Sequence, residues 1–448
     1  MRASETQLSY DLHFSSSEYY PLALTNGTAI SLGQFRNDVL KNRDRLPEGN
    51  GKILINCHGR YAFSVALLAS WLAGKTVILP PNTLDETLDV IRSQGSLAYE
   101  FDSTWSASLL DGKSKTVHGD WPISLENFDN ALELFTSGST GKPKVIVKSI
   151  ANLFDEVIAL RDQFDWPNGP ITGSVPPTHL YGLTFTVLLP WILHTPWIDD
   201  IPLFPGDITR ILKNSASLTL ISVPTQYKAL LQDHADLSQI TCISAAAPLP
   251  AELATKWKQR FGSEILEIYG STETGVIGYR EQVSVSAWKA FPNVHLAAET
   301  GILKVCSPFV SHAWKNGYLT ADKVVLENAT SFQLLGRSDS IVKIAGKRIS
   351  LTKIENGLLS CPGVMEAAVI AVPEKGYVRD SAIWAAVIGK QEHPLSARQL
   401  QADLRGKLES IEIPRRIVIV DKLPHTANGK LPLTAIKKLF GNGKPQRV

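Results

Sequence analysis

The sequence predicts an α/β protein with a large N-terminal domain of layered, largely parallel sheets and a smaller C-terminal α+β domain. Three observations support this fold class. First, apolar strand-length runs alternate with helix-length segments between residues 52 and 269. Second, stretches rich in hydroxyl residues and glycine follow several of those runs. Third, the arrangement of expected helices and strands changes near Arg337. Strands that alternate with helices usually form parallel sheets. A chain of 448 residues also exceeds what one hydrophobic core supports. We therefore expect domains at residues 1–338 and 339–448.

The spacing of apolar residues along the sequence predicts where the individual helices and strands lie. In the N-terminal part, strands are expected at 52–57, 75–80, 217–223, 240–246 and 264–269, and helices at 61–73, 83–94, 225–232 and 251–261. Beyond Arg337, helices are expected at 350–359 and 397–408, and strands at 367–372, 382–388 and 416–420. Ligands of parallel sheets bind beyond the carboxyl ends of the strands. The polar motifs described below follow strand ends of this kind.

The composition is that of a soluble globular protein, with 44% hydrophobic residues, 20% charged residues and a net charge of +2. The apolar stretches at 65–71 and 183–193 are too short or too interrupted to span a bilayer. The N-terminal residues lack the apolar run of a signal peptide. Four widely spaced cysteines favour reduced, mostly buried thiols over a zinc site: Cys57, Cys242, Cys306 and Cys361. We expect a cytoplasmic protein without a membrane span or a nucleic-acid partner.

Charge is distributed unevenly along the chain. Residues 339–448 contain 18 Lys and Arg against 10 Asp and Glu, a net charge of +8. The remaining residues contain 27 and 33, a net charge of −6. A basic C-terminal domain favours contact with an anionic partner. A solvated, lysine-rich surface explains the same counts equally well.

One loop has the composition of a polyphosphate clamp. Residues 135–144 read Phe-Thr-Ser-Gly-Ser-Thr-Gly-Lys-Pro-Lys and follow an apolar strand-like run. Its glycines, Gly138 and Gly141, let backbone N–H groups approach anionic oxygens closely. Lys144 adds a positive charge, and hydroxyl donors come from Thr136, Ser137, Ser139 and Thr140. A Walker A motif would open a helix, whereas residues 144–149 alternate like a second strand, which argues against a P-loop ATPase.

Further motifs occur at other strand ends. His179 lies in a turn before an apolar run, and the small residues of Ser244-Ala-Ala-Ala-Pro leave room for a flat ring. Residues 268–275, Ile-Tyr-Gly-Ser-Thr-Glu-Thr-Gly, supply an aromatic ring, hydroxyls and a carboxylate. Gly317-Tyr-Leu-Thr-Ala-Asp322, Gly336-Arg-Ser-Asp339 and Thr426-Ala-Asn-Gly-Lys430 add charged groups near or beyond the domain boundary. Each motif alone would more often be an ordinary turn or loop.

In this order and spacing, the motifs resemble the adenylate-forming superfamily of acyl- and aryl-CoA synthetases, peptide-synthetase adenylation domains and firefly luciferase. The likeness covers about residues 130–435. It implies a large N-terminal domain with a small mobile C-terminal domain. It also implies that ATP activates a small carboxylic acid as an acyl-adenylate with release of pyrophosphate. A pantetheine thiol, from CoA or from the phosphopantetheine of an acyl carrier protein, would then take the acyl group.

The resemblance also implies residue roles. Residues 136–144 would hold the β- and γ-phosphates, with Lys144 as the phosphate-loop lysine. Tyr269 would stack on adenine, whose edge meets the backbone near Ala246 and Ala247. Thr272 would bond the α-phosphate, and Glu273 would hold Mg²⁺.

The remaining roles involve the acyl pocket and the C-terminal part of the chain. Asp322 would accept hydrogen bonds from the ribose, with Arg337 beside it. Lys430 would bridge the substrate carboxylate and the α-phosphate, and His179 would line the acyl pocket. Asp339 would act as the hinge on which the C-terminal domain rotates. That rotation would bring Lys343 and Gly346 to the thiol channel.

Some positions depart from the family pattern, and three alternatives remain open. Val145, Ala245 and Ala321 stand where the family usually has glycine, and Ala245 could narrow the acyl pocket. A catalytically silent nucleotide-binding relative is disfavoured by the retained charged residues. An amino-acid-activating enzyme is disfavoured because no obvious carboxylate follows Gly182. A luciferase-like oxidation shares the first half-reaction. We expect an aryl or medium-chain acid as the substrate.

Overall fold

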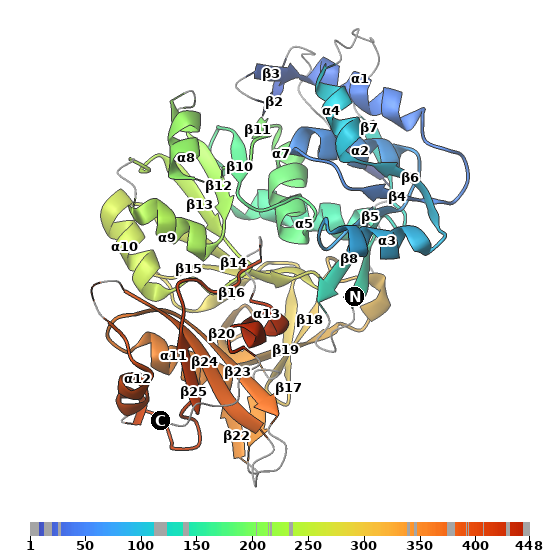
Figure 1. The fold of residues 1–448 in the computed structure, drawn as a ribbon. Coiled ribbons are helices and arrows are strands. Elements are labelled where there is room, and N and C mark those ends of the chain that lie inside the picture. The colour runs from blue at the N-terminus through green and yellow to red at the C-terminus, as the bar shows by residue number, and fades with distance from the viewer. Residues whose placement is uncertain are drawn as a thin grey trace. The chain divides into compact units, whose positions relative to one another are not determined.

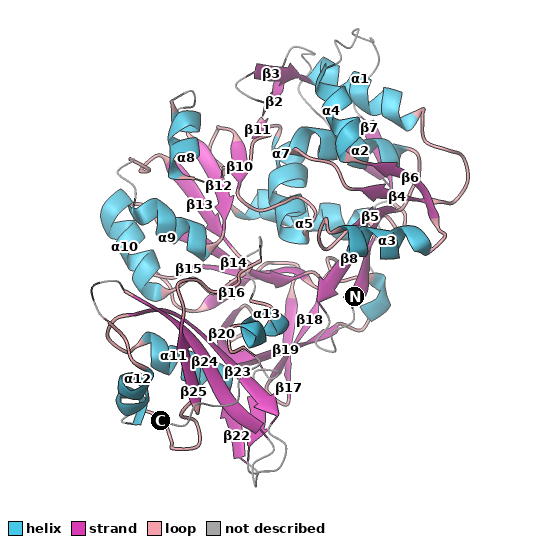
Figure 2. Ribbon diagram, viewed as in Figure 1, coloured by secondary structure: helices cyan, strands magenta, loops and turns pink. Residues whose placement is uncertain are grey.

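The computed structural model describes residues 9–12, 20–25, 28–111, 123–137, 143–202, 204–213, 215, 217–232, 236–337, 341–344, 347–373, 381–390, 392, 394–405, 407–426 and 431–441. The chain forms two compact units. The first contains Met1–Ala297, Lys304–Tyr318 and Glu327–Phe332, and the second contains Ala298–Leu303, Leu319–Leu326 and Gln333–Val448. Each unit mixes helices and strands, as the sequence predicted (Figures 1 and 2).

One sheet of the first unit carries the N-terminal alternation of strands and helices. Its order is β6 (Leu97–Phe101), β4 (Lys52–Ile55), β5 (Val77–Leu79), β8 (Leu132–Ser137) and β9 (Pro143–Lys148). All neighbouring strands are parallel except β8 and β9. The helices between them are α2 (Arg60–Leu72), α3 (Asp85–Ser93) and α4 (Ser103–Asp111). Helix α2 is apolar on almost every side and is almost wholly buried.

A second sheet of the first unit contains a parallel central part. Its order runs β14 (Ile265–Ser271), β13 (Ile240–Ser244), β12 (Leu218–Ser222), β10 (Ile171–Gly173), β11 (Trp197–Ile198) and β2 (Pro21–Thr25). Strand β3 (Thr28–Ser31) pairs antiparallel with β2. The helices that neighbour these strands along the chain are α1 (Leu32–Arg43), α5 (Ile150–Gln163), α8 (Pro205–Leu212), α9 (Pro224–Gln232) and α10 (Ala251–Phe261). A separate pair joins β1 (Ser9–Leu12) to β7 (Ile123–Glu126).

After β14 the chain reverses direction, which the prediction of largely parallel sheets did not include. β15 (Gly275–Glu281) pairs antiparallel with β14, and β16 (Trp288–Ala290) pairs antiparallel with β15. The next strands are β17 (His295–Glu299), β18 (Ile302–Cys306), β19 (Tyr318–Leu326) and β20 (Ser331–Arg337), with the short helix η2 (His312–Trp314) before β19. The residues of this region are divided between the two units.

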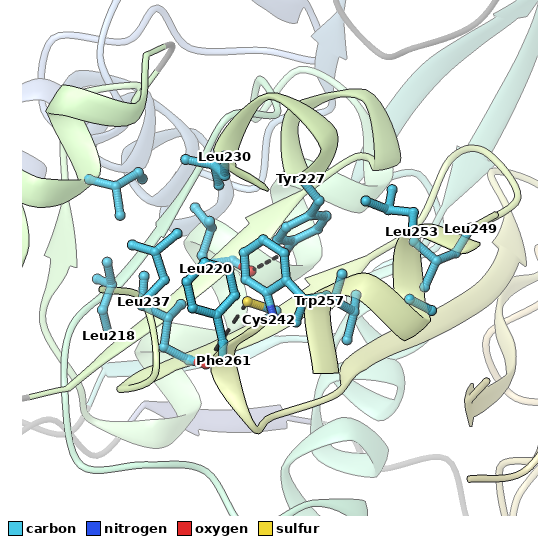
Figure 3. Close-up of a cluster of buried hydrophobic side chains, with 14 residues drawn as sticks. Leu218, Leu220, Tyr227, Leu230, Leu237, Cys242, Leu249, Leu253, Trp257 and Phe261 are labelled. Carbon is cyan, nitrogen blue, oxygen red and sulfur yellow. Dashed lines mark hydrogen bonds between the residues drawn. The ribbon is translucent and has the colours of Figure 1, made fainter. Parts of the chain in front are cut away.

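Helices α9 and α10 pack on the outer face of β12 and β13. Tyr227 and Leu230 of α9 and Trp257 of α10 form one buried cluster with Leu220 and other residues of the two strands (Figure 3). The Tyr227 hydroxyl donates to the carbonyls of Leu220 and Ile243, each at 2.8 Å. The polar tip of this buried ring is therefore satisfied, and α9 is attached to both strands.

The second unit has its own cores. β23 (Val364–Pro373) is antiparallel to β24 (Ser381–Gly389), which is parallel to β25 (Arg416–Ile419). Because strand side chains alternate, Ala385 and Val387 join one core with α11 (Leu351–Leu359) and α12 (Ala397–Arg405), whereas Ala386 joins another with Ile436 of α13 (Leu433–Lys438). A hairpin of β21 (Ile341–Ile344) and β22 (Lys347–Ser350) precedes α11.

Two further expectations concern cysteines and membranes. All four cysteines are unpaired, and Cys242 and Cys361 are buried, whereas Cys57 and Cys306 are only partly buried. Burial raises the pKa of the Cys57 thiol to about 12. In the described part of the chain, no helix has both the length and the apolarity to cross a bilayer.

Candidate active site

The phosphate-loop motif lies between two antiparallel strands. β8 ends at Ser137 and β9 begins at Pro143, with Thr136 opposite Lys144. Gly138, Ser139, Thr140 and Gly141 lie outside the described residues, as do the side chains of Thr136 and Ser137. The motif is therefore followed by a strand, which agrees with the sequence prediction and differs from a Walker A motif.

Lys144 is exposed at the start of β9. Its Nζ lies 4.6 Å from the ring centre of Trp314 and 5.7 Å from that of Tyr318. Such a cation–π contact contributes about 0.5–1 kcal/mol at exposed sites. A phosphate oxygen carries a formal charge, so it can compete with this contact for the ammonium group.

Residues 271–275 form a closed turn between β14 and β15. The N–H of Ser271 donates to Thr274 Oγ1, and the N–H of Thr274 donates to Ser271 Oγ, both at 3.2 Å. The two hydroxyl oxygens lie 3.0 Å apart. Thr272 and Glu273, between these closing residues, are half-buried. The turn therefore presents a hydroxyl and a carboxylate on a hydrogen-bonded backbone.

Tyr269, just before this turn, has a half-buried ring supported by other aromatic rings. Its centre lies 5.5 Å from that of Trp288 and 6.0 Å from that of Phe332. Offset or tilted ring pairs at this spacing are favourable. The partly exposed ring is suited to stacking on a flat ligand.

The small residues after β13 adopt an unusual backbone conformation. Ala246 has φ of +69°, the left-handed region that favours glycine, and it is exposed. Ala245 is buried and Ala247 is half-buried. A left-handed alanine costs roughly 1–2 kcal/mol, and strain of this kind is found preferentially at functional sites.

His179 precedes a helical segment that the sequence did not predict in detail. It is half-buried at the start of α6 (Leu180–Leu183), which continues as the π-helix η1 (Thr184–Leu188) and α7 (Leu189–Leu193). Pro190 lacks the backbone N–H that an α-helical ladder would use. Gly182 is required sterically, because a Cβ there would lie 2.0 Å from the carbonyl oxygen of Pro176.

Lys148 and Glu156 are charged residues near the 271–275 turn that the sequence analysis missed. Lys148 Nζ donates to the carbonyl of Glu273 at 3.1 Å and to that of Phe309 at 2.6 Å. Glu156 Oε1 accepts the N–H of Val276 at 3.1 Å. Burial lowers the pKa of Lys148 and raises that of Glu156, and each group's charge partly offsets the other's shift.

A signal for this pair was present in the sequence. Lys148 is in phase with the apolar Ile146 on its strand, and Glu156 lies on the same helix face as Leu153 and Leu160. Opposite charges at two core-facing positions eight residues apart indicate a buried pair.

In the second unit, Asp322 and Arg337 lie together. Arg337 Nη1 is 3.5 Å from Asp322 Oδ1, and the N–H of Asp322 donates to Thr320 Oγ1 at 3.0 Å. The Asp322 side chain is only 17% exposed, against 53% for Arg337. The arginine therefore steadies a carboxylate whose position is also fixed through its backbone.

The remaining predicted site residues are not described in full. Lys430, Asp339 and Gly346 lie outside the described residues. Lys343 is described only in its backbone, within β21 opposite Arg348.

The 271–275 turn offers oxygen ligands suited to Mg²⁺, a hard cation. Within the described residues, no group of three or more His, Cys, Asp or Glu side chains could hold a metal ion. Mg²⁺ commonly uses one or two carboxylates together with substrate phosphates and water. The single carboxylate of Glu273 beside the hydroxyl of Thr272 fits that manner of binding.

Comparison with known proteins identifies the family. Residues 73–297 match the family model described as AMP-binding enzyme, and residues 353–430 match the AMP-binding enzyme C-terminal domain. The first model alone covers half of the chain. The chain thus belongs to the AMP-binding enzyme family.

The relatives are acyl-CoA synthetases and related adenylate-forming enzymes. Acyl-coenzyme A synthetase ACSM2, mitochondrial, from Rattus norvegicus is 27% identical over 357 residues, covering 68% of this chain and 60% of that protein. The match thus spans less than two thirds of that relative's length.

Solved structures show the same fold. ATP-bound MatB from Rhodopseudomonas palustris has a TM-score of 0.80 at 20% identity, covering 96% of this chain and 97% of that one. o-Succinylbenzoate CoA synthetase from Bacillus subtilis, in complex with its acyl-adenylate intermediate, has a TM-score of 0.79 at 18% identity, covering 95% and 96%.

Proposed function

We propose that this protein activates a small carboxylic acid with ATP and transfers the acyl group to a pantetheine thiol. The observation that carries the proposal is the presence, in one chain, of both parts of the AMP-binding enzyme family. The Thr272–Glu273 turn and the Asp322–Arg337 pair support it, because they supply the hydroxyl, carboxylate and cation that the chemistry requires.

The first half-reaction makes the carboxylate a better electrophile. A carboxylate oxygen attacks the α-phosphorus of ATP, the bond from that phosphorus to the bridging oxygen breaks, and pyrophosphate leaves. Such a phosphoryl transfer depends mainly on positioning and charge neutralisation. Residues 136–144 hold the β- and γ-phosphates, Thr272 donates to the α-phosphate, and Glu273 ligates Mg²⁺, which neutralises phosphate charge when bound.

Other residues position the nucleoside and the acid. Tyr269 stacks on adenine, whose edge meets the backbone of Ala246 and Ala247. Asp322 accepts hydrogen bonds from the ribose hydroxyls, with Arg337 beside it. Lys430 neutralises charge between the carboxylate and the α-phosphate, and His179 lines the acyl pocket.

The second half-reaction uses a different arrangement of the proposed domains, 1–338 and 339–448. Rotation about Asp339 withdraws Lys430 and brings Lys343 and Gly346 to the thiol channel. The thiolate then attacks the acyl carbonyl and AMP leaves. The acceptor is CoA or a carrier-protein phosphopantetheine, both of which suit the net charge of +8 on residues 339–448.

We propose an aryl or medium-chain acid as the substrate, in keeping with o-succinylbenzoate in a structural relative. A panel of aryl, medium-chain, dicarboxylic and amino acids would be scored by pyrophosphate release, with Mg²⁺ and ATP. The panel would be repeated with CoA and with a holo carrier protein to identify the acceptor. Absence of acid-dependent pyrophosphate release across the panel would contradict the proposed activity and support a silent nucleotide-binding relative.

A further inference from the structure

Lys148 and Glu156 are two buried residues of opposite charge that influence each other electrostatically, and the proposed chemistry assigns them no role. Lys148 is 0% exposed and Glu156 is 2% exposed. Lys148 contacts the β14–β15 turn through the Glu273 carbonyl, and Glu156 contacts the N–H of Val276, the second residue of β15. The turn that carries Thr272 and Glu273 and the strand that follows it are therefore each held by a side chain distant in sequence.

The pair also connects the two sheets of the first unit. Lys148 is the last residue of β9, the strand that begins next to the phosphate-loop motif, whereas Glu273 follows β14 of the other sheet. Asn152 of α5 strengthens the junction by donating to the carbonyls of Pro308 and Val310 at 2.7 and 3.1 Å. Lys148 binds the carbonyl of Phe309 between them.

Close packing leaves little room for the turn to shift. Gly275 has φ of +70°, and a Cβ at that position would lie 2.8 Å from both Glu156 Oε2 and Phe309 Cβ. The chain thus passes directly over the Glu156 carboxylate.

Stability alone does not explain the choice of a charged pair. Replacing a buried ion pair by well-packed apolar residues is often neutral or stabilising. Apolar side chains could fill the same volume, but they could not donate to the Glu273 and Phe309 carbonyls or accept the Val276 N–H. What the charged pair adds is directional contact with the turn.

We propose that Lys148 and Glu156 are positioning residues that hold the 271–275 turn and the start of β15 against the strand leading from the phosphate loop. They thereby set where Thr272 and Glu273 meet the nucleotide and its Mg²⁺. This inference rests on the proposed function for the chemical roles of Thr272 and Glu273, but the anchoring of the turn can be tested without activity.

The test compares Lys148→Met, the double variant Lys148→Met/Glu156→Gln, and the control Lys75→Met. Lys75 is also a buried lysine of the first unit, 6% exposed, whose Nζ donates to the carbonyl of Gly49, away from the turn. Three kinds of measurement are made on each protein. The first is the rate of hydrogen exchange in the peptide covering residues 271–277, and the second is the melting temperature. The third is the kinetics of pyrophosphate release: kcat, KM and the half-activating concentration of Mg²⁺.

Lys148→Met is expected to lower kcat about 10- to 100-fold and to raise the half-activating Mg²⁺ concentration, because supporting residues of metal sites have effects of this size. The KM for the acid should change much less. Exchange in residues 271–277 should become faster than in Lys75→Met. The double variant removes the uncompensated Glu156 charge, so its melting temperature should be higher than that of Lys148→Met. Its kcat should remain low, because the Glu273 carbonyl still lacks the Lys148 donor.

Two results would overturn the inference: unchanged exchange of residues 271–277 in Lys148→Met, or recovery of wild-type kcat and Mg²⁺ dependence in the double variant. Failure of the proposed function can be distinguished from failure of this inference. If the proposed function is wrong, the wild-type protein releases no pyrophosphate, but hydrogen exchange still shows whether Lys148 holds residues 271–277.

Discussion

Lys144 and Lys148 lie on the same strand, four residues apart and in the same phase, yet their environments are opposite. Lys144 is exposed beside Trp314, whereas Lys148 is fully buried beneath the Glu273 and Phe309 carbonyls. The ammonium group of Lys144 can replace its contact with the Trp314 ring by a contact with an anion. Lys148 cannot move without losing its two hydrogen bonds. Their different roles follow from burial, because the start of β9 at Lys144 is exposed whereas its last residue, Lys148, is buried.

Lys430 provides the sharpest test of the proposed chemistry at the scale of single residues. Lys430→Ala should lower the rate of adenylation about 100- to 1000-fold, roughly 3–4 kcal/mol, because it removes a cation placed where charge develops. Thioester formation from a supplied acyl-adenylate should stay largely intact. The two half-reactions would be assayed separately, with the exposed Lys422→Ala as the control. Equal loss of both half-reactions would contradict the assigned role.

Glu273→Gln tests the proposed ligand for Mg²⁺. The amide keeps the size of the side chain but removes its charge, so the half-activating Mg²⁺ concentration should rise about tenfold or more. Titration of pyrophosphate release with Mg²⁺ would measure the change, and Glu281→Gln, at the exposed end of β15, is the matched control. An unaltered Mg²⁺ requirement would remove Glu273 from the proposed set of ligands.

At the scale of elements, local signals predicted those segments whose burial is uniform or follows the period of a helix. The expected helix at 251–261 is observed as Ala251–Phe261, and the expected strand at 217–223 as Leu218–Ser222. Long amphipathic or wholly apolar runs of this kind carry their own periodicity. The strands β15–β20 were not predicted, and several of them do not alternate regularly between buried and exposed residues. β17 and β19, for example, have almost no buried positions.

The buried pair linking β9, α5 and the β14–β15 turn should be visible in the pH dependence of stability. In Lys148→Met, Glu156 loses the charge that offsets the burial-induced rise of its pKa, so that pKa should rise further. Between the unfolded pKa of about 4.3 and this raised value, the folded state binds more protons than the unfolded state. Stability therefore falls as pH increases through that window.

The matched comparison is with Lys148→Met/Glu156→Gln, which has no titrating group at residue 156. Thermal melts at intervals from about pH 5 to 8 should show the single variant losing melting temperature relative to the double variant as pH rises. Parallel curves would show that Glu156 is not buried as a lone carboxyl group in the single variant.

At the scale of the whole molecule, the chain combines two units that have separate cores. The second unit contains a three-stranded sheet of β23, β24 and β25 with helices packed on both faces, and so it has hydrophobic cores of its own. The proposed domain rotation depends on such separate cores.

Asp339→Pro tests that rotation. Proline fixes φ near −65° and removes a backbone N–H, so it should impair thioester formation more than adenylation. Asp339→Asn, which leaves the backbone free to rotate, should affect both steps little. The ratio of the two half-reaction rates is the measurement. Normal thioester formation in the proline variant would count against a hinge at this position.

Sequence alone determined the family, the two-part organisation of the motifs and most helices and parallel strands. These features depend on local periodicity and on residue types that recur in a set order, such as Thr136–Lys144 and Tyr269–Glu273. Tertiary structure decided which charges are buried and what they hold. Lys148 becomes a turn anchor only because residues 273 and 309, more than a hundred positions further along the chain, bring their carbonyls to its ammonium group. Local periodicity likewise does not encode the left-handed conformation of Ala246 or the π-helix after Leu183.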